Sequence, residues 1–191
     1  VFNLFASLGT SNAKKEKDLN DFLKELGIQD KTTRFDHHLC HAASAYYGLS
    51  SADKNEEYLV FSMDGGGDGK TSAVYKGKNN KLELIAQSDS FSPACLYAHI
   101  TYIMGFMPHE HEYKLMGLAP YASPKYSKAV YDMLSNFIGF SPNNPLVFNN
   151  SKYTDVSNSK GHGKQELIKD LFIATSNVRF DNLASGLQML A

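Results

Sequence analysis

The sequence predicts an α/β fold in which a small sheet is flanked by helices, and three observations support this prediction. Residues 58–63 read YLVFSM, an almost wholly apolar run with the length of a strand. Residues 71–75 and 82–87 are also rich in strand-forming residues, and the turn signal KGKNN separates them. Before and after this block, apolar residues recur at helical spacing.

The segment between the first two strands, DGGGDGKT at 64–71, is similar to a phosphate-binding P-loop only at first sight. The P-loop pattern G-x-x-x-x-G-K-[ST] would need a glycine where Asp64 stands. It would also need a helix after the Lys-Thr pair, whereas residues 71–77 have the composition of a strand. We therefore expect two antiparallel strands joined by a glycine-rich loop.

The elements expected before the strands are a helix over residues 14–27, a short strand at 32–35, a helix over 37–47 and a polar linker at 51–57. Gly27 and Gly48 are natural C-terminal stops for the two helices. Asp36 can cap the second helix.

After the strands, the apolar spacing predicts helices over residues 93–104, 127–137, 164–176 and 181–190. Residues 141–164 are rich in proline, asparagine, serine and glycine, which predicts a long turn-rich segment. Within it, SKGHGK at 159–164 could hold a phosphate, but we favour a surface loop.

Composition excludes several classes of function. The chain has 191 residues, 42% of them apolar, and a formal net charge of −1, so nothing indicates bulk binding to nucleic acid or to an anionic membrane. No apolar run approaches the roughly 18–20 residues that span a bilayer. Cys40 and Cys95 lie in apolar surroundings and are expected to be buried thiols of a reduced, cytoplasmic protein. Because the chain begins at Val1 and its last helix lacks a stop signal, we expect a fragment of a longer protein.

Two histidines of the second helix form the first candidate site. His37 and His41 are four residues apart, so both imidazoles project from one face of a helix and can share one metal ion. His38, on another face of the helix, should point elsewhere, and His109 and His111 should not join the site. The alternative is a pair of ordinary surface histidines. The glutamate of an H-E-x-x-H protease is absent from this pair.

The glycine-rich loop forms the second candidate site. Asp64 ends an apolar strand beside Gly65, Gly66 and Gly67, so a carboxylate that can ligate a cation stands next to exposed backbone amides that can hold phosphate oxygens. Asp68 follows in the same loop. The alternative is a tight hairpin that binds no ligand.

The stretch HEHEYKLMGLAPY at 109–121 is less specific. Its alternating histidines and glutamates are more typical of a solvated polar loop than of a metal site. Glu112 and Lys114 precede an apolar, glycine-containing run and are candidates for positioning a polar ligand at a cleft.

Taken together, these motifs resemble the NodU/CmcH family of carbamoyltransferases. DHHLCHAASAY at 36–46, DGGGDG at 64–69 and EYKLMGLAPY at 112–121 occur in the order and spacing of that family. The resemblance is strong over residues 30–135 and looser near NLASGLQ at 182–188.

The resemblance implies an actin-like ATPase (ribonuclease H-like) fold, as a partial domain with a mixed sheet and flanking helices. Residues 1–57 would end its first lobe and residues 58–191 would begin its second. Members of the family make carbamoyl-adenylate from carbamoyl phosphate and ATP in a YrdC-like domain, which this chain does not contain. The domain seen here would then move the carbamoyl group to a hydroxyl of an acceptor such as a sugar or natural product.

Carried over by residue, the resemblance assigns His37, His41 and Asp64 to a divalent metal, Fe²⁺ first, with Zn²⁺ or Mn²⁺ as alternatives. It assigns Gly65–Gly67 and Asp68 to the nucleotide phosphates. The family's base histidine and a later metal-binding aspartate have no counterpart here, so this chain alone is expected to be inactive. Two alternatives are a threonylcarbamoyl-transferring tRNA-modification protein and a non-catalytic nucleotide-binding module of the same fold.

Overall fold

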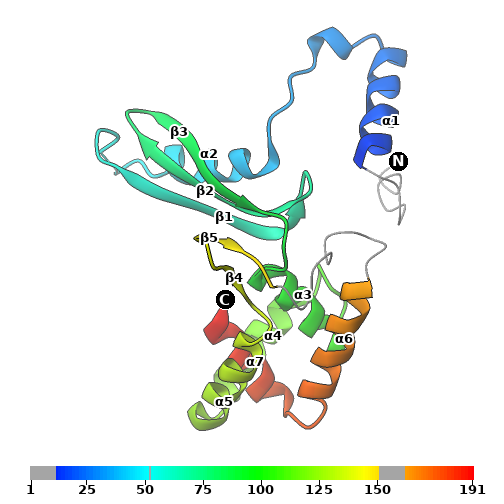
Figure 1. Ribbon diagram of the computed structural model, residues 1–191, viewed down its shortest axis with the longest axis vertical. Coiled ribbons are helices and arrows are strands. Elements are labelled where there is room, and N and C mark those ends of the chain that lie inside the picture. The colour runs from blue at the N-terminus through cyan, green and yellow to red at the C-terminus, as the bar shows by residue number, and fades with distance from the viewer. Residues whose placement is uncertain (1–11, 52, 151–161) are drawn as a thin grey trace.

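The computed structural model describes residues 12–51, 53–150 and 162–191. Figure 1 shows a three-stranded sheet with α2 along one face, and a group of helices at one end of that sheet. Helix α1 stands away from both, at the end of an extended segment. The predicted α/β class is thus confirmed for the described residues, whereas the actin-like ATPase fold stays a prediction.

The helices are α1 (Asn12–Glu25), α2 (His37–Gly48), α3 (Pro93–Ile103), α4 (Glu112–Leu118), α5 (Pro124–Ser135), α6 (His162–Thr175) and α7 (Phe180–Leu190), with 3₁₀ turns at Gln29–Lys31 and Ala119–Tyr121. The strands are β1 (Tyr58–Gly67), β2 (Lys70–Lys78), β3 (Lys81–Ser88), β4 (Phe140–Ser141) and β5 (Asn144–Phe148).

Both sheets of the described residues are antiparallel, so the expected mixed sheet is wrong for this part of the chain. The reason is the shortness of the connections, because strands joined by two-residue turns can only run in opposite directions. Asn79 and Asn80 join β2 to β3 with φ of 50° and 57°. Positive φ at both central residues is the signature of a type I′ hairpin turn, which asparagine tolerates well.

A small apolar core fixes α2 on the sheet. Ala42 and Tyr46 pack against Val60, Ala73 and Tyr75 of β1 and β2. The packing is close: a Cβ added at Gly77 would lie 2.7 Å from Cε2 of Tyr46. Helix α2 is therefore packed closely on the sheet, and this packing holds the histidine pair at a fixed distance from β1.

The second core is helical and larger. Its buried residues come from the segment before α3, from α3 to α7 and from the segments between these helices: Phe91, Leu96, Ile100, Met104, Leu115, Val130, Leu134, Phe137, Leu167, Leu171, Leu183, Ala184 and Leu187. The β4–β5 hairpin lies between this core and the sheet (Figure 1), where Ser88 Oγ donates to the carbonyl of Phe148 at 2.8 Å.

Several sequence-based expectations need correction. Residues 32–35 are extended but pair with no strand among the described residues, and Phe35 is 70% exposed. No element was expected over residues 112–118, where α4 forms, and the turn-rich segment expected at 141–164 contains most of the β4–β5 hairpin. The phosphate-loop candidate at 159–164 lies half outside the described residues, and its other half begins α6.

The two cysteines are not buried as expected. Cys40 is exposed and Cys95 is half-buried. On α2, positions 38, 42 and 46 face the sheet, which turns position 40 toward the opposite side of the helix. Apolar neighbours in sequence therefore did not indicate burial.

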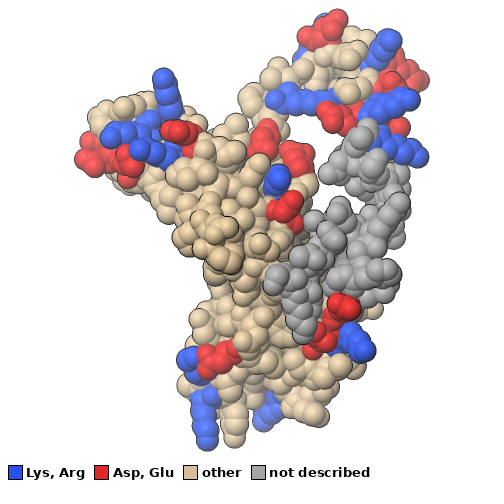
Figure 2. Space-filling view, viewed as in Figure 1, with Lys and Arg blue, Asp and Glu red and all other residues tan. Residues whose placement is uncertain are grey.

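Charged side chains are unevenly placed on the face shown in Figure 2. They gather on α1 and at the end of the sheet near the β2–β3 turn, with acidic and basic groups interspersed. Near that turn, Glu57 pairs with Lys76 at 2.9 Å and Lys78 at 3.7 Å. No helix of the described residues is long and apolar enough to cross a membrane.

Candidate metal centre

The first turn of α2 is held by two carboxylates. Asp36 is the N-cap, as expected, and its Oδ1 accepts the backbone N–H of Leu39 at 2.7 Å. Asp68, from the turn after β1, accepts the backbone N–H of His37 at 2.9 Å. Negative charge at a helix N-terminus is favourable because the first N–H groups lack partners within the helix. These two contacts fix the direction in which His37 and His41 project.

An irregularity in β1 places Asp64. Between the paired residues Met63–Ser72 and Gly67–Lys70, β1 carries three residues (64–66) whereas β2 carries only Thr71. Extra residues in one strand bend it and re-aim its side chains. The hairpin then closes at Asp68 and Gly69, with φ of 51° and 77°. The glycine-rich segment therefore joins two antiparallel strands, as the sequence predicts, but it consists of a strand bulge and a two-residue turn instead of a glycine-rich loop.

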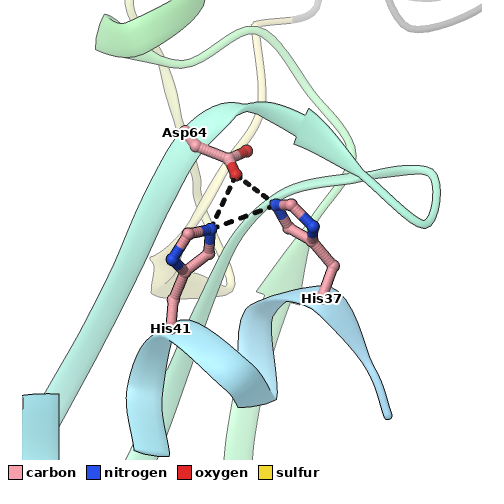
Figure 3. Close-up of side chains that lie close together, drawn as sticks. All are labelled: His37, His41 and Asp64. Carbon is pink, nitrogen blue, oxygen red and sulfur yellow. Dashed lines mark hydrogen bonds and ion pairs between the residues drawn. The ribbon is translucent and has the colours of Figure 1, made fainter. Parts of the chain in front are cut away.

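Three side chains converge at this point (Figure 3). His37 Nε2 lies 2.5 Å from Asp64 Oδ2, His41 Nε2 lies 3.2 Å from the same oxygen, and the two Nε2 atoms are 3.1 Å apart. A point at a metal–ligand distance of about 2.0–2.2 Å from all three atoms exists just outside their plane. The three residues can therefore contact one ion together, and they are the one such group among the described residues.

The donor set suits a divalent transition metal. Burial raises the pKa of the Asp64 carboxyl, but hydrogen bonds from His37 and from the backbone N–H of Gly66 outweigh burial and leave the pKa below its usual value. Asp64 is therefore a carboxylate at neutral pH. One carboxylate and two imidazoles are ligands for Fe, Zn or Mn, and they do not select one of them.

The orientation of the three atoms is compatible with a shared ion and with hydrogen bonds between the side chains. Both imidazoles direct Nε2, not Nδ1, at the same carboxylate oxygen and at each other. An imidazole that carries its proton on Nε2 can donate to Oδ2, whereas one with an unprotonated Nε2 can offer its lone pair to a cation. Asp64 Oδ1 is meanwhile held by the backbone N–H of Gly66 at 2.6 Å, which leaves Oδ2 for the ion.

Comparison with known proteins identifies the family. The family model described as the carbamoyltransferase N-terminus matches residues 10–187. The chain belongs to the carbamoyltransferase family. The sequence-based resemblance is thereby confirmed at the level of the family.

Several curated proteins are similar to this carbamoyltransferase chain. An uncharacterized protein of Synechocystis is 34% identical over 132 residues, covering 63% of the chain and 21% of the relative. An uncharacterized protein of Methanocaldococcus jannaschii is 42% identical over 106 residues, covering 55% and 19%. Nodulation protein NolNO of Sinorhizobium fredii is 33% identical over 105 residues, covering 52% and 15%. The chain thus matches about a fifth or less of the length of these relatives.

The residues predicted to bind phosphate in the carbamoyltransferase chain lie next to the three-residue cluster, but some already have structural roles. The amide of Gly66 donates to Asp64, and Asp68 holds the start of α2. Gly67 lies against the ring of His37, since a Cβ there would come under 3.0 Å from three ring atoms. Their assignment to nucleotide binding stays a prediction.

Of the two predicted ligand-positioning residues, one borders the glycine-rich loop. Glu112 Oε1 accepts the backbone N–H of His109 at 2.6 Å, and the His109 ring lies beside Gly65. Lys114 instead places Nζ 5.4 Å from the ring centre of Phe106. His109 itself does not join the three-residue cluster, as expected.

His38 is on another face of α2 and stays outside the three-residue cluster, as expected, but it lies closer to Asp64 than its spacing predicts. It is 1% exposed, and its Nε2 lies 3.9 Å from Asp64 Oδ1. His38 shares the helical stripe of Ala42 and Tyr46, and that stripe packs on β1, which also carries Asp64.

Proposed function

We propose that this chain holds a divalent metal through His37, His41 and Asp64 and uses it to transfer a carbamoyl group to a hydroxyl of an acceptor. The observation that carries the proposal is the convergence of the two Nε2 atoms and Asp64 Oδ2 on one point. Membership of the carbamoyltransferase family supports the reaction class. The preferred ion is Fe²⁺, with Zn²⁺ or Mn²⁺ as alternatives.

The chemistry explains why such a site is useful. When an alcohol attacks the carbonyl carbon of a carbamoyl–phosphate anhydride, negative charge develops on the carbonyl oxygen and on the departing phosphate. A bound divalent ion supplies positive charge at that place without a proton transfer. His37 and His41 contribute neutral donors and Asp64 contributes one negative charge, so the occupied site keeps a net positive charge that can attract phosphate oxygens.

The donor in the proposed reaction is carbamoyl-adenylate, made from carbamoyl phosphate and ATP in a YrdC-like domain of the full chain. The exposed glycines at 65 and 66 follow Asp64 of the three-residue cluster, and they have no side chains that would block an approaching phosphate. Gly65 is the cleaner residue for a test, since Gly66 has φ of 132° and donates to Asp64. Replacing Gly65 with Val should lower ATP affinity at least about threefold in calorimetry with metal binding kept; unchanged ATP affinity would remove this loop from the nucleotide site.

The decisive test of the proposed function uses His41→Ala in the full chain. Loss of one imidazole should abolish carbamoyl transfer to the acceptor while carbamoyl-adenylate formation continues, because the two steps use different sites. Cys40→Ala is the matched control, since Cys40 is exposed on the same helix and outside the cluster. Retained transfer by His41→Ala after treatment with a chelator would show that the chemistry belongs to other residues.

The same assays separate the alternatives. A non-catalytic module would bind metal and ATP but transfer nothing to any hydroxyl acceptor. A threonylcarbamoyl-transferring protein would act on tRNA, which the formal net charge of −1 does not favour.

A further inference from the structure

We infer that His38 is a positioning residue that orients the Asp64 carboxylate for metal binding through a hydrogen bond from Nε2–H to Oδ1. This inference rests on the metal site proposed above. It starts from a buried polar atom: His38 is 1% exposed, yet its Nε2 has no hydrogen-bond partner within the described parts of the chain. A buried polar atom without a partner is costly, so each such atom needs an explanation.

The other ring nitrogen sets the tautomer of His38. Nδ1 lies 2.8 Å from Oγ of Ser62, which is itself buried on β1. If Ser62 donates its hydroxyl proton to Nδ1, the ring proton stands on Nε2 and faces a carboxylate oxygen. The opposite tautomer would direct a lone pair of Nε2 at Asp64 Oδ1, which is repulsive. The geometry therefore favours Ser62 as donor and Nε2–H as the group that faces Asp64.

The two oxygens of Asp64 have separate surroundings. Oδ2 faces His37 Nε2 and His41 Nε2, whereas Oδ1 accepts from the backbone N–H of Gly66 and lies 3.9 Å from His38 Nε2. A hydrogen bond needs a separation of about 3 Å, so the ring and the carboxylate must approach by about 1 Å. Ligand atoms at near-tetrahedral angles around an ion stand about 3.3 Å apart, so binding an ion with that geometry would widen the 2.5 Å contact between His37 and Asp64. The same movement of the Asp64 carboxylate could bring Oδ1 toward His38.

The two oxygens of the Asp64 carboxylate would therefore have different roles. Oδ2 would bind the ion, whereas Oδ1 would be held by the backbone amide of Gly66 and by the neutral imidazole of His38. Because Nε2 of His38 carries the proton, that atom cannot also bind the ion. Outer partners of this kind fix the orientation of a ligand, and their loss commonly costs about 10–100-fold in metal affinity. His38 would thereby contribute to the site without touching the ion.

The test compares two substitutions that differ in one donor. In the full chain, His38→Leu removes both ring nitrogens, whereas His38→Gln places an amide N–H close to the position of Nε2. With Co²⁺ as the probe, His38→Leu should weaken binding at least about tenfold and alter the visible d–d spectrum, whereas His38→Gln should stay within about threefold of the unsubstituted protein. Far-UV circular dichroism checks that each variant is folded.

The other possible results of this comparison overturn either the role of His38 or the metal site itself. Equal Co²⁺ affinity for folded His38→Leu and the unsubstituted protein would overturn this inference and leave the metal site intact. Equal weakening in the Leu and Gln variants would also overturn it, because packing would then be the cause. If the unsubstituted protein does not bind Co²⁺, the proposed metal site fails and this inference fails with it.

A second measurement does not depend on whether His38→Leu folds. Long-range ¹H–¹⁵N NMR of the imidazole ring should show the proton of His38 on Nε2 and none on Nδ1. Ser62→Ala, which removes the hydroxyl and keeps the ring, should weaken Co²⁺ binding a few-fold. A proton on Nδ1 in the unsubstituted protein would overturn the inference.

Discussion

The imidazole ring of His37 occupies the space that a side chain of residue 67 would fill. A Cβ added at Gly67 would lie under 3.0 Å from Cγ, Cδ2 and Nδ1 of that ring. The glycine-rich segment is therefore shaped around a metal-ligand candidate, whatever else it binds. Close backbone approach of this kind is a recognised use of glycine.

Gly67→Ala should therefore displace the His37 ring and lower metal affinity by at least about tenfold. Gly65→Ala is the matched control, because its Cβ would meet only Cε1 of His109 at 3.6 Å, an ordinary contact. Calorimetric titration with Co²⁺ distinguishes the two variants. Equal metal affinities in both would show that the His37 ring is not held by residue 67.

Tyr75 gives a prediction about alkaline stability. Burial and then the adjacent Asp36 carboxylate raise the pKa of Tyr75 to about 12, from an ordinary value of 10.0. Because the pKa of the folded state lies above that of the unfolded chain, the stability from neutral Tyr75 is complete below pH 10 and is lost as the pH rises to about 12.

Tyr75→Phe cannot ionise, so its free energy of unfolding should fall less steeply over that interval. Urea unfolding of both proteins at several pH values between about 9 and 11.5 measures the difference, and the contributions of the other tyrosines cancel in the comparison. If the free energy of unfolding falls equally with pH in the two proteins, the raised pKa of Tyr75 would be contradicted.

Two helical glycines give opposite predictions for the helical core. A Cβ at Gly186 of α7 would lie 2.5 Å from Cβ of Val130 and 2.9 Å from the backbone nitrogen of Tyr131, so Gly186→Ala should destabilise by about 1–3 kcal/mol. Gly117 of α4 is exposed with nothing within 4 Å of its Cβ position, and Gly117→Ala should stabilise by about 0.5–1 kcal/mol. Thermal unfolding tests both. A stable Gly186→Ala would mean that α5 and α7 pack less closely than described.

Local signals predicted much of the fold. The Asp36 cap and the Gly27 stop with φ of 64° depend on a few neighbouring residues, so the sequence alone was sufficient for them. The strand at 32–35 failed because pairing depends on a distant partner, which extended residues do not reveal. The short α4 and the β4–β5 hairpin depend on packing against α7 and β3 for the same reason.

In the candidate site too, the sequence predicted what depends on neighbouring residues but not what depends on packing between elements. The spacing of His37 and His41 predicts that they share a helix face, and the structure confirms that Asp64 lies within reach of both. Which side of α2 faces the sheet could not be predicted from spacing alone, and this is why the approach of His38 to Asp64 was not foreseen and Cys40 was expected to be buried. The engagement of Gly66 and Asp68 in hydrogen bonds within the chain also depends on the bulge in β1, which the glycines alone do not specify.

The central claim is that one ion binds to His37, His41 and Asp64, and a crystal structure of the full chain with Co²⁺ tests it most directly. Anomalous difference maps at the cobalt edge should show one peak about 2.0–2.3 Å from His37 Nε2, His41 Nε2 and Asp64 Oδ2. A map with the peak elsewhere, or with no peak and a direct hydrogen bond between His37 and Asp64, would contradict the account.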